Sequence, residues 1–355
     1  MTTSPQPLIS SPRNMTYLRG PFYQNTSTVW DPNFDMDDFF AQPISAAIMA
    51  FVHIKPMTAG GTPEIVINNV PLSDSKMVDA LNALKAANTT ASGGQKFPIL
   101  LSIGGAGNPQ DWTNIQSKPT AWATAIYQKL IVPFGFAGID IDNEDWPGDT
   151  SDAGTQGKAI GQFLETLAAY RLTSASKLIV SVAPYAPQFD DSTPDYAGYS
   201  AICSYLRTIN PLYPIRPMVN VQSYGGFDNS LTSALSGTNS TVQTWLGLTD
   251  YSDVTASVAA ARYTNAVYGF CNNSSSSVCP STSSPDDSTI ADEITKARQT
   301  YASQGPDSIT ITTNVSSGLW AYPQIDSSVT PPATQSPYAA WVQTLNQDLG
   351  ISSGS

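Results

Sequence analysis

The chain has 355 residues, 41% of them hydrophobic, which is enough for a large core in one α/β barrel or two smaller domains. Its formal net charge of −12 makes nucleic acid and anionic membrane surfaces poor partners, because both are negatively charged. No run of about twenty apolar residues is present, so we expect no membrane span. Only 12% of the residues are charged, which favours a secreted protein, although residues 1–14 lack the apolar core of a signal peptide.

Eight short apolar runs, rich in β-branched residues, recur along the chain, and we predict that each forms a strand. Their continuous apolar character is typical of a parallel sheet covered by helices, since alternating strands face water on one side. The predicted strands are residues 15–20, 46–54, 98–103, 136–142, 178–183, 217–222, 266–270 and 316–322.

The segments between the strands have helical patterns. Residues 73–88, for example, begin with Ser and Asp and repeat Met77, Leu81 and Leu84 along one face. The predicted helices are residues 73–88, 119–130, 156–171, 196–208, 288–303 and 337–349.

The regular alternation of strands and helices predicts a single (β/α)8 barrel, a TIM barrel, over residues 15–349. A doubly wound open sheet is the alternative. Because such a barrel takes about 250 residues, the remainder should form tails and loop insertions. We place the tails at residues 1–14 and 350–355, and the insertions at residues 225–262 and 272–287.

The fourth predicted strand ends in acids at every second position, Asp140, Asp142 and Glu144. Successive side chains of a strand point to opposite faces, so the acids share one face while Ile139 and Ile141 share the other. Neighbouring carboxylates repel one another, so at least one should keep its proton near neutral pH. A protonated acid beside ionised ones is what a glycosidase uses to protonate its leaving group. A Mg²⁺ site is the alternative use of such a row.

Histidine and cysteine are scarce. A single histidine, His53, excludes a His-rich zinc site and leaves any Ser/His/Asp triad dependent on that residue; on an apolar strand it is more typical of structure than of catalysis. Cys271 and Cys279 flank a Ser-rich loop. A disulfide between them and two free thiols are equally open interpretations.

In a (β/α)8 barrel the active site lies at the carboxyl ends of the strands, and several motifs fall there in chain order. They are the pair Ala50-Phe51, the motif Ser102-Ile103-Gly104-Gly105, the acidic motif from Gly138 to Glu144, the motif Gln222-Ser223-Tyr224, and Trp320. On these motifs the chain resembles glycoside hydrolase family 18, the chitinase and endo-β-N-acetylglucosaminidase family, in particular its plant and fungal type chitinases. One departure stands out, because the family has an Asp at the position of Ala137.

The resemblance implies substrate-assisted, retaining cleavage of β-1,4 linkages between N-acetylglucosamine units. The implied catalytic residues are Glu144 as general acid, Asp142 and Tyr224 as groups that hold the substrate's acetamido group, and Asp140 as support for Asp142. Substrate contacts are expected at Trp320, Gln222, Gly104, Gly105, Tyr185 and Phe51.

No metal or cofactor is expected, and the resemblance favours a secreted monomer that binds a polysaccharide or oligosaccharide of N-acetylglucosamine. Two alternatives remain. One is endo-β-N-acetylglucosaminidase activity on N-glycan cores, since the polar residues around Glu144 differ from those of common chitinases. The other is a catalytically silent, chitinase-like sugar-binding protein.

Overall fold

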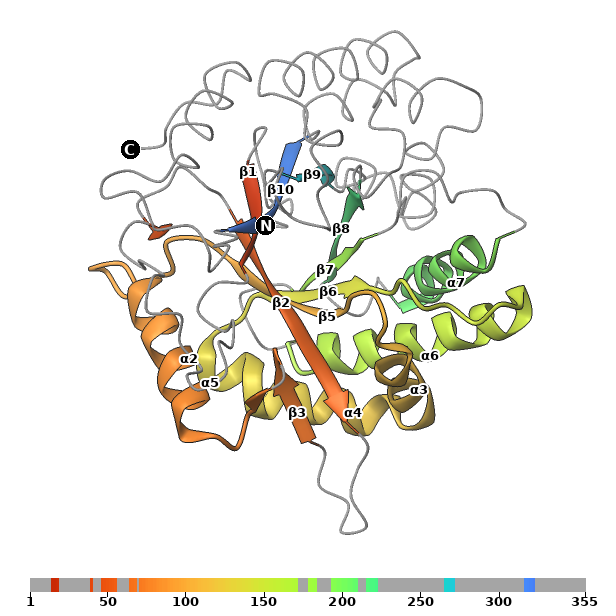
Figure 1. The fold of residues 1–355 in the computed structure, drawn as a ribbon, viewed down its shortest axis with the longest axis horizontal. Coiled ribbons are helices and arrows are strands. Elements are labelled where there is room, and N and C mark those ends of the chain that lie inside the picture. The colour runs from red at the N-terminus through yellow and green to blue at the C-terminus, as the bar shows by residue number, and fades with distance from the viewer. Residues whose placement is uncertain are drawn as a thin grey trace, which may run out of the picture.

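The structure is a computed structural model. It describes residues 14–18, 39–40, 46–55, 64–68, 70–171, 178–183, 193–209, 215–222, 265–271 and 316–322. Strands occupy the centre of the described part, and helices lie outside them (Figure 1).

Within these ranges, eight parallel strands close into a barrel. Their pairing runs from β1 through β2, β5, β6, β7, β8, β9 and β10, and β10 pairs again with β1. The strands are β1 (Asn14–Leu18), β2 (Ala46–Lys55), β5 (Ile99–Gly104), β6 (Gly138–Asp142), β7 (Leu178–Val182), β8 (Ile215–Gln222), β9 (Asn265–Cys271) and β10 (Ser316–Tyr322). The closed ring confirms the predicted barrel and excludes the open sheet, which would leave two unpaired edges.

Each of the eight predicted strands overlaps one strand of this barrel. The first begins at Asn14, one residue inside the predicted tail. The rest of the two tails, both predicted insertions and the predicted helices at 288–303 and 337–349 lie outside the described residues.

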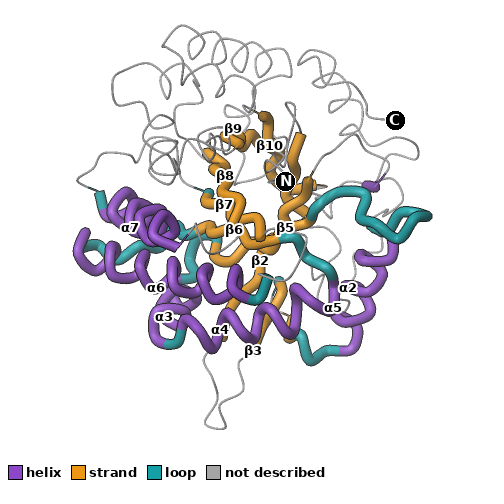
Figure 2. The backbone as a smooth tube through the Cα atoms, turned by 180° about the vertical axis from the view of Figure 1, so that it is seen from behind, coloured by secondary structure: helices purple, strands orange, loops and turns teal. Residues whose placement is uncertain are grey.

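The helices cover the outer face of β2, β5, β6 and β7, as the view from behind shows (Figure 2). They are α2 (Ser75–Ala87), α3 (Pro109–Ser117), α4 (Pro119–Ile126), the π-helical turn η2 (Tyr127–Ile131), α5 (Val132–Phe134), α6 (Thr150–Ala169) and α7 (Pro194–Ile209). Helix α2 shows why these segments are helical. The Asp74 side chain caps its first turn by accepting the Lys76 N–H at 2.9 Å, and Met77, Leu81 and Leu84 are buried as predicted.

Helix α6 begins at Thr150, six residues before the predicted start, because Asp149 caps it at both Ser151 and Asp152. Its first turns are polar and contain glycine, so the sequence there has only a weak helical pattern. Gly157 has a packing reason: a Cβ there would collide with the backbone of α7 at Gly198. The small residue therefore allows the two helices to pack closely.

Several elements were not predicted. Strands β3 (Glu64–Ile67) and β4 (Val70–Pro71) form an antiparallel extension on β2, and both are too short to show a clear period. Helix α3 was missed because the side of it that faces β2 is partly polar. Asp111 and Asn114 are buried there and bond to the backbone of β2.

In the part of the chain that the structure describes, no helix is long and apolar enough to cross a membrane.

Candidate active site

The carboxyl end of β6 places the acidic row as predicted. Asp140 and Asp142 are fully buried on one face of the strand, and Ile139 and Ile141 belong to the hydrophobic core that the helices cover. Ser102 lies opposite Asp140 on β5, and its hydroxyl donates to Asp140 Oδ2 at 2.7 Å. This places a serine of the Ser-x-Gly-Gly motif as a direct support for the first acid of the row.

Glu144 lies just beyond the strand and is half-buried. The pKa of its carboxyl is raised from 4.5 to about 7. Burial contributes most to this shift, the negative charge of Asp145 adds to it, and a backbone hydrogen bond from Ala106 opposes it. An elevated pKa was predicted from repulsion within the acidic row, and the structure gives a different main cause. Desolvation is the largest contribution, and the neighbouring charge comes from Asp145, outside the row of alternating acids.

Two glycines bring the end of β5 against this acidic row. Gly104 and Gly105 have φ values of 112° and 76°, which disfavour other residues. The Gly105 N–H donates to the carbonyl of Asp142 at 2.9 Å, and a Cβ on Gly105 would lie 2.9 Å from the ring of Phe51. The structure therefore brings together Phe51, both glycines and Asp142, as expected from the sequence.

Asn68, in the turn between β3 and β4, fixes the backbone at Phe51. Its side chain accepts the Phe51 N–H and donates to the Ala50 carbonyl, each at 3.1 Å. Its own N–H donates to the Phe51 carbonyl, also at 3.1 Å. The unpredicted hairpin thus has a use, because it holds one wall of the site.

His53, two residues beyond Phe51 on β2, has the structural role suggested by the sequence. Its Nδ1 lies 2.8 Å from Oδ2 of Asp111, which is only 3% exposed. The other oxygen of Asp111 accepts the Ile54 N–H at 2.6 Å. Helix α3 is therefore tied to the end of β2 through one buried carboxylate.

Tyr199 of α7 lies behind the acids and is buried. Its hydroxyl is 3.2 Å from the carbonyl of Asn143 and 3.5 Å from that of Ala183, which links the ends of β6 and β7. Burial raises the pKa of the Tyr199 phenol well above its usual value, and the charge of Asp142 adds to this effect. Tyr199 is therefore a neutral hydrogen-bond donor at neutral pH.

The other predicted contacts are only partly described. The structure gives the backbone of Gln222 at the end of β8, of Trp320 in β10 and of Cys271 at the end of β9. Tyr224, Tyr185 and Cys279 lie outside the described residues.

Among the described residues, no group of three or more His, Cys, Asp or Glu side chains is arranged to hold a metal ion.

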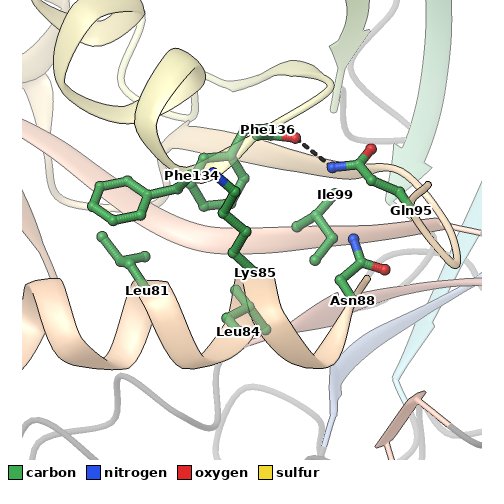
Figure 3. Close-up of a pocket in the computed structure, with 9 residues that line it drawn as sticks. Leu81, Leu84, Lys85, Asn88, Gln95, Ile99, Phe134 and Phe136 are labelled. Carbon is green, nitrogen blue, oxygen red and sulfur yellow. Dashed lines mark hydrogen bonds between the residues drawn. The ribbon is translucent and has the colours of Figure 1, made fainter. Parts of the chain in front are cut away.

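A small pocket lies at the opposite end of the barrel, near Ile99 at the start of β5 and Phe136 just before β6 (Figure 3). Leu81 and Leu84 of α2 line it together with Phe134. It contains no acid and is separated from Glu144 by the length of the strands, so it is not part of the candidate site.

Sequence reasoning missed several residues that support the site: Asn68, Asn108, Asp111, Asp145 and Tyr199. Each acts through a hydrogen bond to a residue distant in the sequence or to backbone. Only Asp145 could have been noticed in the sequence, as an additional acid directly after Glu144.

Comparison with known proteins agrees with this geometry. The sequence profile of glycosyl hydrolases family 18 matches residues 17–348. No curated protein matches the chain by sequence. Among solved structures, a GH18 chitinase from Pseudoalteromonas aurantia is 17% identical, with a TM-score of 0.57 over 95% of this chain and 100% of that chain.

The catalytic domain of a psychrophilic chitinase B from Arthrobacter TAD20 is 13% identical, with a TM-score of 0.52 over 98% of this chain and 97% of that chain. At these identities the likeness shows a shared fold. The family match covers nearly the whole barrel, and this chain therefore belongs to family 18 of the glycosyl hydrolases.

Proposed function

We propose that this protein is a retaining glycoside hydrolase that cleaves β-1,4 linkages between N-acetylglucosamine units of chitin or chitooligosaccharides. The observation that carries the proposal is the half-buried Glu144, whose pKa is raised to about 7 at the carboxyl end of a family 18 barrel. A carboxyl with this pKa is protonated in about half of the molecules at neutral pH, so it can serve as an acid and then as a base.

In the first step Glu144 gives its proton to the glycosidic oxygen as the bond to the anomeric carbon breaks. The carbonyl oxygen of the sugar's own 2-acetamido group forms the new bond to that carbon, which gives an oxazolinium ion. An internal nucleophile held in this way has a high effective concentration. In the second step a water molecule attacks the anomeric carbon, gives a proton to Glu144 and reopens the ring.

Asp142 accepts the acetamido N–H in this proposal, and its negative charge stabilises the oxazolinium ion. Asp140, held by Ser102, supports Asp142 from inside the barrel. Tyr224 donates to the acetamido oxygen and sets its angle of attack.

The sugar ring lies against aromatic side chains at Phe51, Trp320 and Tyr185, because sugars present an apolar ring face and a rim of hydroxyls. Gly104 and Gly105 allow close approach of backbone, and Gln222 bonds to hydroxyls. We further propose that the protein acts as a secreted monomer, which suits a polymeric substrate outside the cell.

The test is hydrolysis of N-acetylglucosamine oligomers by the wild type and by Glu144→Gln. We expect the variant to lose about 10²–10⁴-fold in kcat, the usual contribution of a general acid, with little change in affinity for the oligomer. Glu165→Gln is a matched control on α6. Glu165 accepts a hydrogen bond from the Tyr205 hydroxyl at 2.7 Å and lies in α6, outside the acidic row. Its variant should therefore be fully active.

A high-mannose glycopeptide, assayed beside the oligomers, separates the alternative substrate. Cleavage of the glycopeptide alone would replace chitin with the N-glycan core. If wild type and Glu144→Gln bind the oligomers equally and cleave neither substrate, the protein is a sugar-binding member of the family and the proposal is wrong.

A further inference from the structure

The acid that follows Glu144 has a defined place in the structure. Asp145 is half-buried in the loop after β6, and its Oδ2 accepts the backbone N–H of Asn108 at 2.6 Å. A short bond from a backbone N–H to a carboxylate is among the stronger hydrogen bonds in proteins. Asp145 thus connects the loop after β6 to the loop after β5.

Asn108 in turn organises the loop after β5. Its side-chain Nδ2 lies 3.3 Å from the carbonyl of Gly104 and 3.1 Å from the carbonyls of both Gly105 and Ala106. An amide NH₂ has two hydrogens, so these three carbonyls share them. The same loop supplies the backbone hydrogen bond from Ala106 to Glu144. The path from Asp145 through Asn108 and Ala106 therefore returns to Glu144.

Asn143 anchors the other side of this path. Its Oδ1 accepts the Asp145 N–H at 3.0 Å, and its Nδ2 donates to Gln156 of α6 at 3.0 Å. Both Asn143 and Gln156 are buried. Three consecutive residues around Glu144 are thereby bonded to α6 and to the loop after β5, which fixes the backbone of the acid.

The charged surroundings of Glu144 are predominantly acidic. Asp145, in the same loop, is the charged group that acts on Glu144. Tyr199 of α7 interacts with Glu144 and also with Asp140, Asp142 and Asp195. The loop after β5, residues 104–108, and strand β7 contain no titratable side chain. Asp111 of α3 is bonded to His53.

We propose that Asp145 is a positioning residue for Glu144. Through its hydrogen bond with Asn108, Asp145 fixes the loop that bonds to Glu144, and the negative charge of Asp145 favours the protonated form of Glu144. The inference rests on the proposed role of Glu144 as proton donor and deepens it. The raised pKa of Glu144, to which Asp145 contributes after burial, agrees with this geometry.

The test uses a direct titration of Glu144. The chain contains only four glutamates, Glu64, Glu144, Glu165 and Glu293. Labelling them with ¹³C at the side-chain carboxyl gives four NMR signals in the full-length protein, and the signal that Glu144→Gln removes belongs to Glu144. Asp145→Asn keeps an oxygen that can accept the Asn108 N–H but removes the charge. We expect the Glu144 titration midpoint to move down by about one pH unit in this variant.

Asp149→Asn is the matched control, because it removes the same charge from an exposed residue four positions later and Asn also caps a helix well. Its Glu144 midpoint should equal that of the wild type. Asp145→Ala additionally removes the acceptor for Asn108, so its kcat should fall about tenfold or more while KM changes little. The alkaline limb of kcat/KM should move to lower pH in Asp145→Asn, in parallel with the NMR midpoint.

An unchanged Glu144 midpoint in Asp145→Asn, or an equal shift in Asp149→Asn, would overturn the proposal even if the enzyme is active. Loss of hydrolysis in every form, including wild type, would instead refute the proposed function while the titration still decides the role of Asp145. If Asp145→Ala fails to fold, the near-isosteric Asp145→Asn still gives the answer.

Discussion

The two ends of strands β5 and β6 have opposite characters. At their start, Ile99 and Phe136 pack near Leu84 of α2, and the nearby polar side chains bond to backbone. Gln95, for example, donates to the Gly135 carbonyl at 2.5 Å (Figure 3). At their carboxyl end, the finishing end, Gly104 takes a positive φ and Glu144 has a raised pKa.

This difference separates stability from function along the same two strands. The starting end buries apolar surface and satisfies its polar groups, which stabilises the barrel. The finishing end keeps acids close together and has glycines where a Cβ would collide with its neighbours. These features cost stability, so a fold keeps them only where the arrangement has a use. Substitutions at the starting end should therefore lower the free energy of unfolding, whereas substitutions at the finishing end should lower kcat.

After that of Glu144→Gln, the largest effect on kcat is expected at the finishing end, from Asp142→Asn. The change is nearly isosteric but removes the charge that we propose stabilises the oxazolinium ion, so kcat for N-acetylglucosamine oligomers should fall by about 10²–10³-fold. Steady-state kinetics measure this, and the thermal unfolding midpoint is the control for folding. A variant with wild-type kcat would show that Asp142 has no part in the chemistry.

At the starting end, Leu84→Ala should have the reverse outcome. Leu84 is 2% exposed, so the cavity left behind should lower the free energy of unfolding by about 2–5 kcal/mol. Urea denaturation measures the loss. The kcat per folded molecule should be unchanged, and a large decrease in kcat would mean that the two ends are not independent.

Glu144→Gln should also reveal a stability cost at the finishing end. A pKa raised from 4.5 to about 7 means that the folded protein keeps a proton that the unfolded chain releases. Stability from this group therefore falls as pH rises from about 4.5 to 7, by at most ~3 kcal/mol. The Gln variant lacks this penalty.

The measurement is the free energy of unfolding of both proteins at pH 4 and pH 8. We expect equal values at pH 4 and a more stable Gln variant at pH 8. A constant difference at both pH values would contradict the raised pKa.

The smallest effect is expected for Ala137→Asp, which introduces the acid that the family resemblance implies at this position. Ala137 lies just before β6, at the starting end, where its N–H donates to the Ile99 carbonyl at 2.8 Å. It is thus a strand's length from Glu144, and kcat should change by less than about twofold. A collapse of activity would show that position 137 communicates with the acids.

The sequence predicted the barrel because its strands are continuous apolar runs, which need no knowledge of distant partners to recognise. The alternation of Asp140 and Asp142 with Ile139 and Ile141 was predictable for the same local reason, and the structure confirms it. Helix α3 was not predictable, because its buried Asp111 reads as a surface residue until β2 is placed beside it.

The candidate site was predictable in its motif residues but not in its supports. Glu144 stands out by its spacing from the other acids, whereas the bond between Asp145 and Asn108 joins residues 37 positions apart. The main cause of the raised pKa of Glu144 was not predictable either, because the burial of a side chain depends on the whole fold. Long-range hydrogen bonds and desolvation are therefore what the structure adds.

The most direct test of the central claim is the anomeric configuration of the first product, followed by ¹H NMR during hydrolysis of an N-acetylglucosamine oligomer. Attack by the substrate's own acetamido group, with Glu144 as the acid, predicts that the β-anomer forms first and then mutarotates. Initial formation of the α-anomer would mean direct displacement by water, and it would contradict the roles proposed for both Glu144 and Asp142.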